Sequence, residues 1–200
     1  YLASRYVRES KFNLILGLVL VAITLIPQKS FLTTTVGGFA ENAVSVNYGL
    51  QKDDTITHVD GRRIFTTYDL SYAFSNVDDG AIDITVKRDG KKVELNGVKF
   101  ATEQADGINY LTVDFSVYAR EKTFLSFIDH TFDTAISNCA VVYRSLFDLI
   151  TGRYGISAMS GPVGVTVAIG EVAKRSIMDL IPIMALITIN LGIFNLLPLP

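Results

Sequence analysis

The sequence is poor in the residues that build disulfides and common metal sites. Cys139 is the only cysteine among 200 residues, so the chain can form neither an internal disulfide nor a cysteine-rich metal cluster. Its two histidines, His58 and His130, lie outside any His-Glu-x-x-His arrangement, the ligand pair of many zinc proteases. The formal net charge of −2 gives no global basic surface for nucleic acid. We therefore expect no complete metal site and no catalytic residue within these residues, and no nucleic-acid partner.

Neither histidine is a strong metal-ligand candidate. His58 alternates with Ile56 in a strand pattern, which is typical of a half-exposed strand side chain. His130 stands beside Asp129 and near Asp133 on an expected helix. These three side chains can bind a metal on paper, but a lone histidine among surface acids is more often solvated.

Hydrophobic residues make up 49% of the chain, and they are concentrated at its two ends. Residues 12–27 carry no charge and follow a basic flank, residues 1–11. This pattern predicts a transmembrane helix over residues 12–28 with the flank in the cytoplasm. A cleaved signal peptide is the alternative, although no small-residue cleavage signal follows. Residues 180–200 also lack charge, which predicts a second transmembrane helix over residues 177–200.

The middle of the chain, residues 37–118, reads as a compact α+β domain. Ile82, Ile84 and Val86 alternate with polar residues before the turn signal Asp89-Gly90, which predicts a hairpin. A helix with a capping-box-like start is expected after the preceding hairpin, and a further strand at about 108–117.

Two segments connect this domain to the C-terminal apolar run. Residues 123–151 have apolar side chains at three- and four-residue steps, with charges off that stripe. They predict an amphipathic helix associated with a membrane. Residues 152–176 are rich in glycine and are expected to form a loop that leads into a new helix.

The chain ends in Asn195-Leu-Leu-Pro198-Leu-Pro200. Proline breaks helices, and irregular backbone at membrane depth is tolerated only where protein or a water-filled cavity covers it. We expect an unwound stretch from Asn195 that can pair with an extended peptide. The alternative is that the prolines merely end a span at the membrane interface.

This terminal motif resembles that of the site-2 protease family of intramembrane zinc metalloproteases. The resemblance rests on "SGPVGV" at residues 160–165 and on Asn195, Pro198 and Pro200, which match an Asn-x-x-Pro-x-Pro pattern. It is most similar to the bacterial regulator-of-sigma proteases, which cleave anti-sigma factors. Asn13 matches a recurrent asparagine of the family's second span, although Glu9-Ser10 stands where a Gly-Pro pair is usual.

The resemblance implies an α-helical membrane protein with an inserted α+β PDZ-like domain, located in the bacterial cell membrane with several spans. It implies a zinc cofactor whose ligands lie outside the given sequence, and a transmembrane protein substrate such as an anti-sigma factor. Asn13, Asn195, Pro198 and Pro200 would bind that substrate.

The segment around "YGLQKDDTITHVDGRRI" resembles a single PDZ domain on the extracytoplasmic side. The expected peptide groove lies between a turn and a helix, and its residues are Tyr48, Gly49, Leu50, Leu70 and Phe74. We expect the domain to gate substrates whose outer part is untrimmed, with a mere spacer as the alternative. A membrane-tethered peptide-binding protein without catalysis is the alternative function.

Overall fold

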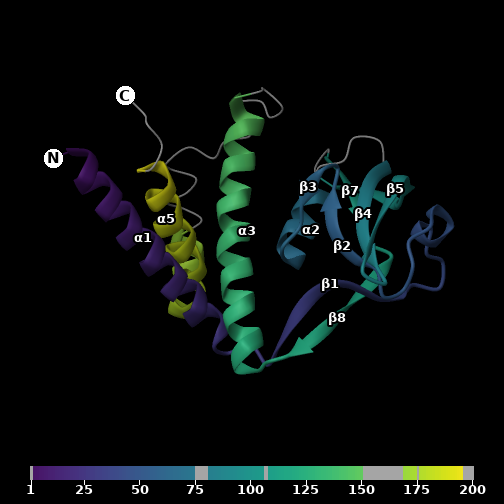
Figure 1. The fold of residues 1–200 in the computed structure, drawn as a ribbon, viewed down its shortest axis with the longest axis horizontal. Helices are drawn as coiled ribbons and strands as arrows, with labels where there is room; N and C mark the ends of the chain where they lie inside the picture. The colour runs from purple at the N-terminus through teal and green to yellow at the C-terminus, as the bar shows by residue number, and fades with distance from the viewer. Residues whose placement is uncertain (1, 75–80, 106–107, 151–168, 175, 196–200) are drawn as a thin grey trace. The chain divides into compact units, whose positions relative to one another are not determined.

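The structure, a computed structural model, describes residues 2–74, 81–105, 108–150, 169–174 and 176–195. The chain consists of two compact units (Figure 1). The helical unit comprises Tyr1–Lys29 and Thr123–Pro200, and the sheet unit comprises Ser30–Lys122.

The helical unit is built on three main helices: α1 (Leu2–Leu25), α3 (Phe124–Ile150) and α5 (Leu180–Phe194). Residues 169–174 are also helical, and the short 3-10 helix η3 (Ile177–Asp179) leads into α5. Helix α1 packs against both α3 and α5. The buried apolar side chains of the unit are Val21, Leu25, Val142, Ala185, Ile189 and Ile193.

The prediction of a helical membrane protein is wrong for these helices, because none in the described part of the chain is both long and apolar enough to cross a membrane. Helix α1 takes in the charged flank and ends at Leu25, so its uncharged part falls short of the about 20 residues that a span needs. Helix α5 has 15 residues, which extend about 22 Å against roughly 30 Å of hydrocarbon. Helix α3 covers the predicted amphipathic segment and carries Asp129, Asp133 and Arg144.

The sheet unit holds a six-stranded sheet in the order β5-β4-β2-β1-β8, with β3 paired to β2. The strand pairings of this sheet are antiparallel throughout the described residues. Strands β6 and β7 form a separate antiparallel pair. The strands are β1 (Ser30–Phe39), β2 (Thr55–Val59), β3 (Arg62–Arg63), β4 (Ala81–Arg88), β5 (Lys91–Lys99), β6 (Ala101–Ala105), β7 (Ile108–Thr112) and β8 (Phe115–Glu121). The unit also contains the 3-10 helix η1 (Ser45–Tyr48) and helix α2 (Thr67–Phe74).

Two local predictions for this unit are confirmed. Asp89 and Gly90 both have positive φ, 48° and 81°, and join β4 to β5. Positive φ at both central residues is the geometry that matches the twist of a two-residue hairpin. At the start of α2, Asp69 Oδ2 accepts hydrogen bonds from the backbone N–H groups of Phe65 and Thr66, at 2.9 and 3.1 Å. This is the reach-back half of a capping box.

The single strand predicted at about 108–117 is instead two strands, β7 and β8. The chain breaks between them because Asp114 turns its carboxylate to the η1 segment. Asp114 Oδ2 accepts from the backbone N–H groups of Val44 and Ser45, at 2.7 and 2.9 Å. Asp114 Oδ1 accepts from the Ser45 hydroxyl at 2.7 Å. These partners are about 70 residues away in sequence, so local periodicity carries no sign of them.

Candidate functional site

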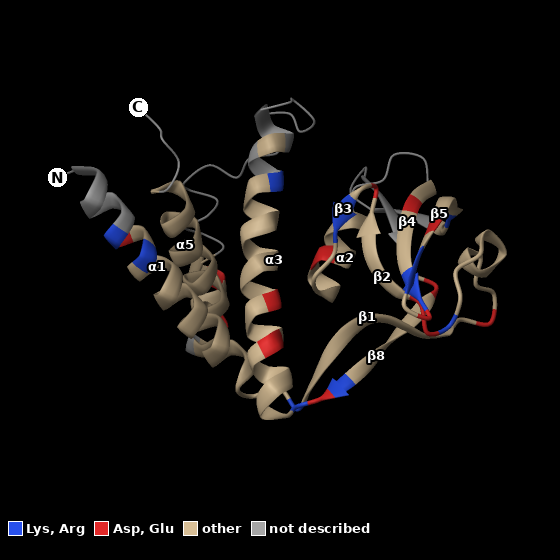
Figure 2. Cartoon of the chain, viewed as in Figure 1, with Lys and Arg blue, Asp and Glu red and all other residues tan. Residues whose placement is uncertain are grey.

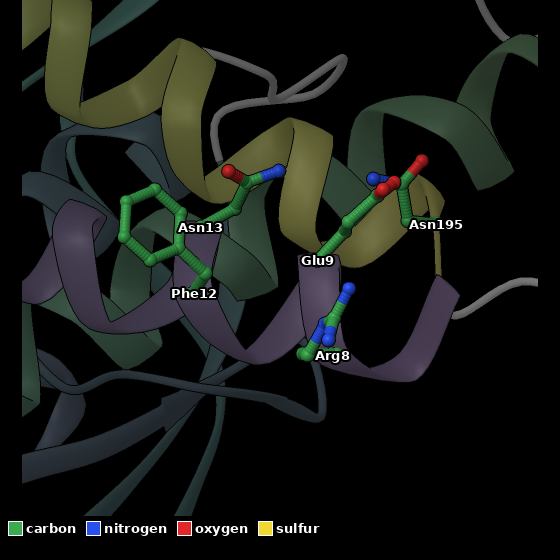
Figure 3. Close-up of a pocket in the computed structure, with 5 residues that line it drawn as sticks. All are labelled: Arg8, Glu9, Phe12, Asn13 and Asn195. Carbon is green, nitrogen blue, oxygen red and sulfur yellow. The ribbon is translucent and has the colours of Figure 1, made fainter. Parts of the chain in front are cut away.

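The helical unit contains a cleft of about 420 Å³ between the ends of α1 and α5. Its lining residues are Arg8, Glu9, Phe12, Asn13 and Asn195 (Figure 3). The structure therefore brings together two of the four residues expected to bind substrate, Asn13 and Asn195. They are 182 positions apart in the sequence.

Sequence reasoning missed three residues of this cleft, namely Arg8, Glu9 and Phe12. Residues four apart share one face of a helix. Glu9 therefore lies one turn from Asn13, and Arg8 lies one turn from Phe12. Helical periodicity from Asn13 backwards was the available signal. The charges of residues 1–11 obscure this signal, because they suggest a boundary where the helix in fact continues.

Two glycines bring the walls of the cleft together. A Cβ atom built on Gly192 of α5 would lie 2.9 Å from Cγ of Leu14, the neighbour of Asn13. One built on Gly17 of α1 would lie 2.5 Å from Cγ1 of Ile189. Contacts this short mean that a side chain at either position would force its neighbours to shift. The backbones of α1 and α5 therefore approach closely, and this approach places Asn195, one turn after Gly192, beside α1.

Asn195 still has helical geometry, at φ −69° and ψ −14°, and forms the C-terminal cap of α5. Its backbone N–H donates to the carbonyl of Leu191 at 3.1 Å. The backbone N–H of Asn195 is therefore already hydrogen-bonded within α5. The side chain of Asn195 lines the cleft. Pro198 and Pro200, the other two predicted substrate-binding residues, lie outside the described residues, as does the segment 160–165.

The cleft offers both hydrogen-bond donors and acceptors. Each asparagine amide has two donors and an acceptor, and an ionised glutamate only accepts. In Figure 3 the side chains of Glu9 and Asn195 point toward each other. A peptide backbone presents alternating N–H and C=O groups, so an amide-rich cleft can satisfy both kinds. Asn190, also on α5, has a buried Oδ1 with no partner among the described residues.

In the sheet unit, most of the residues expected to line a peptide groove belong to the core. Leu50, Leu70 and Phe74 are buried within one cluster of apolar side chains. Tyr48 at the end of η1 is exposed, and Gly49 has a φ of 94° that an L side chain rarely adopts. Peptide binding at these positions stays a prediction, with Tyr48 as the exposed residue among them.

The loop that carries Tyr48 and Gly49 is held in place by ionic hydrogen bonds. The guanidinium of Arg88 donates to both carboxylate oxygens of buried Asp54, at 2.7 and 2.8 Å. Its Nη2 also donates to the carbonyl of Gly49 at 2.8 Å. The hydrogen bond to Asp54 raises the pKa of Arg88, so the guanidinium stays charged. Such a two-pronged pair fixes geometry as well as charge.

Zinc does not fit the residues that the structure describes. Among them, no group of three or more histidine, cysteine, aspartate or glutamate side chains is placed to hold a metal ion. His58 lies on β2 with its Nδ1 3.1 Å from the hydroxyl of Thr57, and His130 lies on α3. A structural or catalytic zinc takes three or four protein ligands.

Comparison with known proteins gives one consistent family. The sequence pattern of peptidase family M50 matches residues 10–200. The chain is 30% identical over 191 residues to the regulator of sigma-W protease RasP of Bacillus subtilis, covering 94% of this chain and 44% of the relative. It is 31% identical over 198 residues to a putative zinc metalloprotease of Staphylococcus aureus (94% and 46%). It is 30% identical over 159 residues to the zinc metalloprotease RasP of Oceanobacillus iheyensis (76% and 37%). The chain thus spans less than half the length of these curated relatives.

Proposed function

This chain belongs to peptidase family M50, and from that membership we propose that it is the substrate-handling part of a zinc metalloprotease of the site-2 type. The protein would cut other proteins within their membrane-spanning segments and would therefore work at the bacterial cell membrane. The relative from Bacillus subtilis is named a regulator of sigma-W protease. By analogy with that name, we propose an anti-sigma factor as the substrate class.

The convergence of Asn13 and Asn195 on one cleft carries this proposal. A membrane-spanning substrate arrives as a helix whose peptide bonds are hydrogen-bonded and closed to attack. Extending it breaks those bonds where no water replaces them. Amide side chains on two packed helices supply replacement partners, and the close approach at Gly17 and Gly192 holds those partners at a fixed separation.

The zinc ligands of the proposed enzyme would come from residues beyond this chain, as the length of the relatives allows. The curated relatives are more than twice as long as the matched region, and the residues described in this chain do not form a zinc site. Bound zinc in such proteases activates a water molecule for attack on the peptide bond. The residues of this chain would hold the substrate extended beside it.

Replacing Asn195 by leucine in the complete protein tests this role. Loss of one buried pairing costs about 1–3 kcal/mol, which corresponds to roughly a ten- to hundredfold slower cleavage. Cleavage of a transmembrane substrate and zinc content are measured on the same samples. The expected result is slow cleavage with zinc unchanged. Asn42→Leu, an exposed asparagine of the sheet unit, is the matched control.

Three other results are informative. Loss of zinc in Asn195→Leu would make the asparagine a support of the metal site. Full activity would make it a packing residue. A protein with no zinc and no cleavage even before substitution would favour the alternative of a binding module without catalysis.

For the sheet unit, we propose a PDZ-like gate on the outer side of the membrane that excludes untrimmed substrates. Ser30 pairs with Glu121 in the β1–β8 ladder, so the two ends of the unit are neighbours. A short flexible linker can therefore replace Ser30–Lys122 without stretching the remaining chain. Deletion is expected to permit cleavage of an untrimmed substrate. If untrimmed substrate stays intact while trimmed substrate is still cut, the gate is wrong.

The side of the membrane is tested separately by cysteine labelling at Asp89→Cys in a Cys139→Ser background. Labelling of intact cells by an impermeant reagent supports the outer side. Labelling only after the inner face is exposed contradicts it.

A further inference from the structure

The sheet unit has a second cleft, of about 280 Å³, that the proposed protease function does not use. It lies over β2, β3 and the β4–β5 hairpin. Four basic side chains line it: His58, Arg63, Lys87 and Lys92. Figure 2 shows the corresponding blue segments on β3 and along β4 and β5. A chain with a net charge of −2 thus gathers several of its cations at one hollow.

The strand register places these basic side chains opposite one another. Lys87 of β4 pairs with Lys92 of β5, and His58 of β2 pairs with Arg63 of β3. Like charges directly across a ladder destabilise it. The hairpin does not need this arrangement, since its turn is specified by Asp89 and Gly90. A pair of cations that destabilises the fold is expected where the two side chains together bind an anionic ligand.

Two of these basic side chains already have partners within the sheet unit. Lys92 Nζ lies 2.6 Å from Glu94 Oε1, and this hydrogen bond lowers the pKa of Glu94. The guanidinium of Arg63 lies 5.1 Å from the centre of the Phe65 ring, within cation–π range. Glu94 shows that a carboxylate is a fitting partner at this site. An exposed pair of this kind holds weakly and can be exchanged for a ligand carboxylate.

The shape and lining of the cleft select among anionic ligands. Its exposed lining side chains include Arg63, Lys87 and Lys92, whereas Ile64 and Val86 are buried in the core cluster. It is a hollow, and a lipid surface is best met by protruding cations. Its described lining residues include no aromatic side chain other than the His58 ring, and single-stranded nucleic acid uses aromatic rings as stacking platforms. A hollow lined by exposed cations fits an extended peptide that carries carboxylates.

We infer that this cleft binds an acidic peptide segment of a partner protein, with carboxylates held by Arg63 and Lys87. This binding is independent of proteolysis and of the amide-lined cleft in the helical unit.

The test uses the full chain and two short fluorescein-labelled peptides, one of alternating glutamate and serine and one with glutamine in place of glutamate. Fluorescence anisotropy gives their affinities. The glutamate peptide is expected to bind and the glutamine peptide to bind at least tenfold more weakly. The double variant Arg63→Gln, Lys87→Gln is expected to lose about tenfold in affinity for the glutamate peptide. Lys99→Gln, an exposed lysine of β5 outside the cleft, is expected to change nothing.

A second measurement separates a binding role from a structural one. Lys87→Gln removes the repulsion across from Lys92, so its thermal unfolding midpoint is expected to equal or exceed that of the unchanged chain while peptide affinity falls. Equal binding of both peptides, or an equal loss in Lys99→Gln, overturns the inference. So does stronger competition by phosphatidylglycerol vesicles than by unlabelled glutamate peptide, which would make the cleft a lipid site.

Discussion

The sheet unit folds its apolar side chains into one cluster, whereas the helical unit joins its helices through backbone approach at two glycines. In the sheet unit, alternation along β4 sends Ile82, Ile84 and Val86 into that cluster. In the helical unit, several of the largest apolar side chains face outward. Phe124, Leu125 and Phe147 of α3 are 78%, 73% and 67% exposed.

The two units also treat polar groups differently. The sheet unit anchors its long β1–β2 connection with carboxylates that accept two or more hydrogen bonds each, as at Asp54 and Asp114. The helical unit leaves the buried Oδ1 of Asn190 without a partner among the described residues. This difference teaches that the two units are sensitive to different kinds of substitution. Removal of a charge is expected to damage the sheet unit, and addition of a methyl group is expected to damage the helical unit.

The largest effect is expected for Arg88→Met in the sheet unit. This change leaves the carboxylate of Asp54 fully buried without its ionic partner. Breaking a buried pair in this way costs about 3–5 kcal/mol, and the lower end applies because Arg88 is a quarter exposed. Thermal unfolding measures the loss, and hydrogen exchange by mass spectrometry locates it.

Two controls sharpen this result. Arg88→Lys keeps the charge without the two-pronged geometry and should lose less, and Lys99→Met removes an exposed cation and should lose little. Faster exchange is expected in peptides of Ser30–Lys122 only. Equal acceleration in α1 and α5 would mean that the units unfold together, and the comparison drawn above would break.

An intermediate effect is expected for Gly17→Val in the helical unit. Its Cβ would meet Ile189 Cγ1 at 2.5 Å, so α1 and α5 must separate. Overpacking of this kind costs about 1–3 kcal/mol. Cys139 on α3 reports the result, because burial raises the pKa of its thiol and so slows alkylation. Since α3 packs on both other helices, iodoacetamide is expected to modify Cys139 faster in the variant.

Gly170→Ala is the matched control, since a Cβ there would have nothing within 4 Å. It is expected to leave alkylation unchanged. If Gly17→Val also leaves alkylation and the unfolding midpoint unchanged, close backbone approach does not hold this unit together.

How far the sequence predicts the structure differs between the units for physical reasons. The Asp89-Gly90 hairpin and the start of α2 follow from local backbone chemistry, so they were predictable. The buried positions of Leu50, Leu70 and Phe74 depend on how the whole unit packs. Sequence periodicity predicts that these residues avoid solvent, but it does not distinguish a position in the core from one in a binding groove.

The candidate site shows the same division. Asn13 and Asn195 were singled out by resemblance to a family motif, whereas the cleft that unites them depends on contacts between distant helices. Helix α1 begins ten residues before the predicted start at residue 12, so charge does not mark its boundary. Arginine, glutamate and lysine are good helix formers, so the helix continues through Arg8, Glu9 and Lys11.

The smallest effect is expected for Tyr118→Phe, at the surface of the sheet unit. The Tyr118 hydroxyl donates to Asp53 Oδ1 at 2.8 Å, and this hydrogen bond raises the pKa of Tyr118 above its usual value of about 10. The neutral phenol is the form that donates, so the bond stabilises the fold fully below about pH 10 and is lost as the pH rises through the raised pKa. The unchanged chain is therefore expected to be slightly more stable than Tyr118→Phe at pH 7. That difference in stability should vanish in more alkaline solution, where lysine titration affects both proteins alike.

Urea unfolding of both proteins at pH 7, 10 and 12 measures this difference, with exposed Tyr68→Phe on α2 as the matched control. A difference that stays constant across this range would assign the effect to packing of the ring edge instead of the hydrogen bond. The Tyr118–Asp53 hydrogen bond would then contribute nothing to the anchoring of the β1–β2 connection.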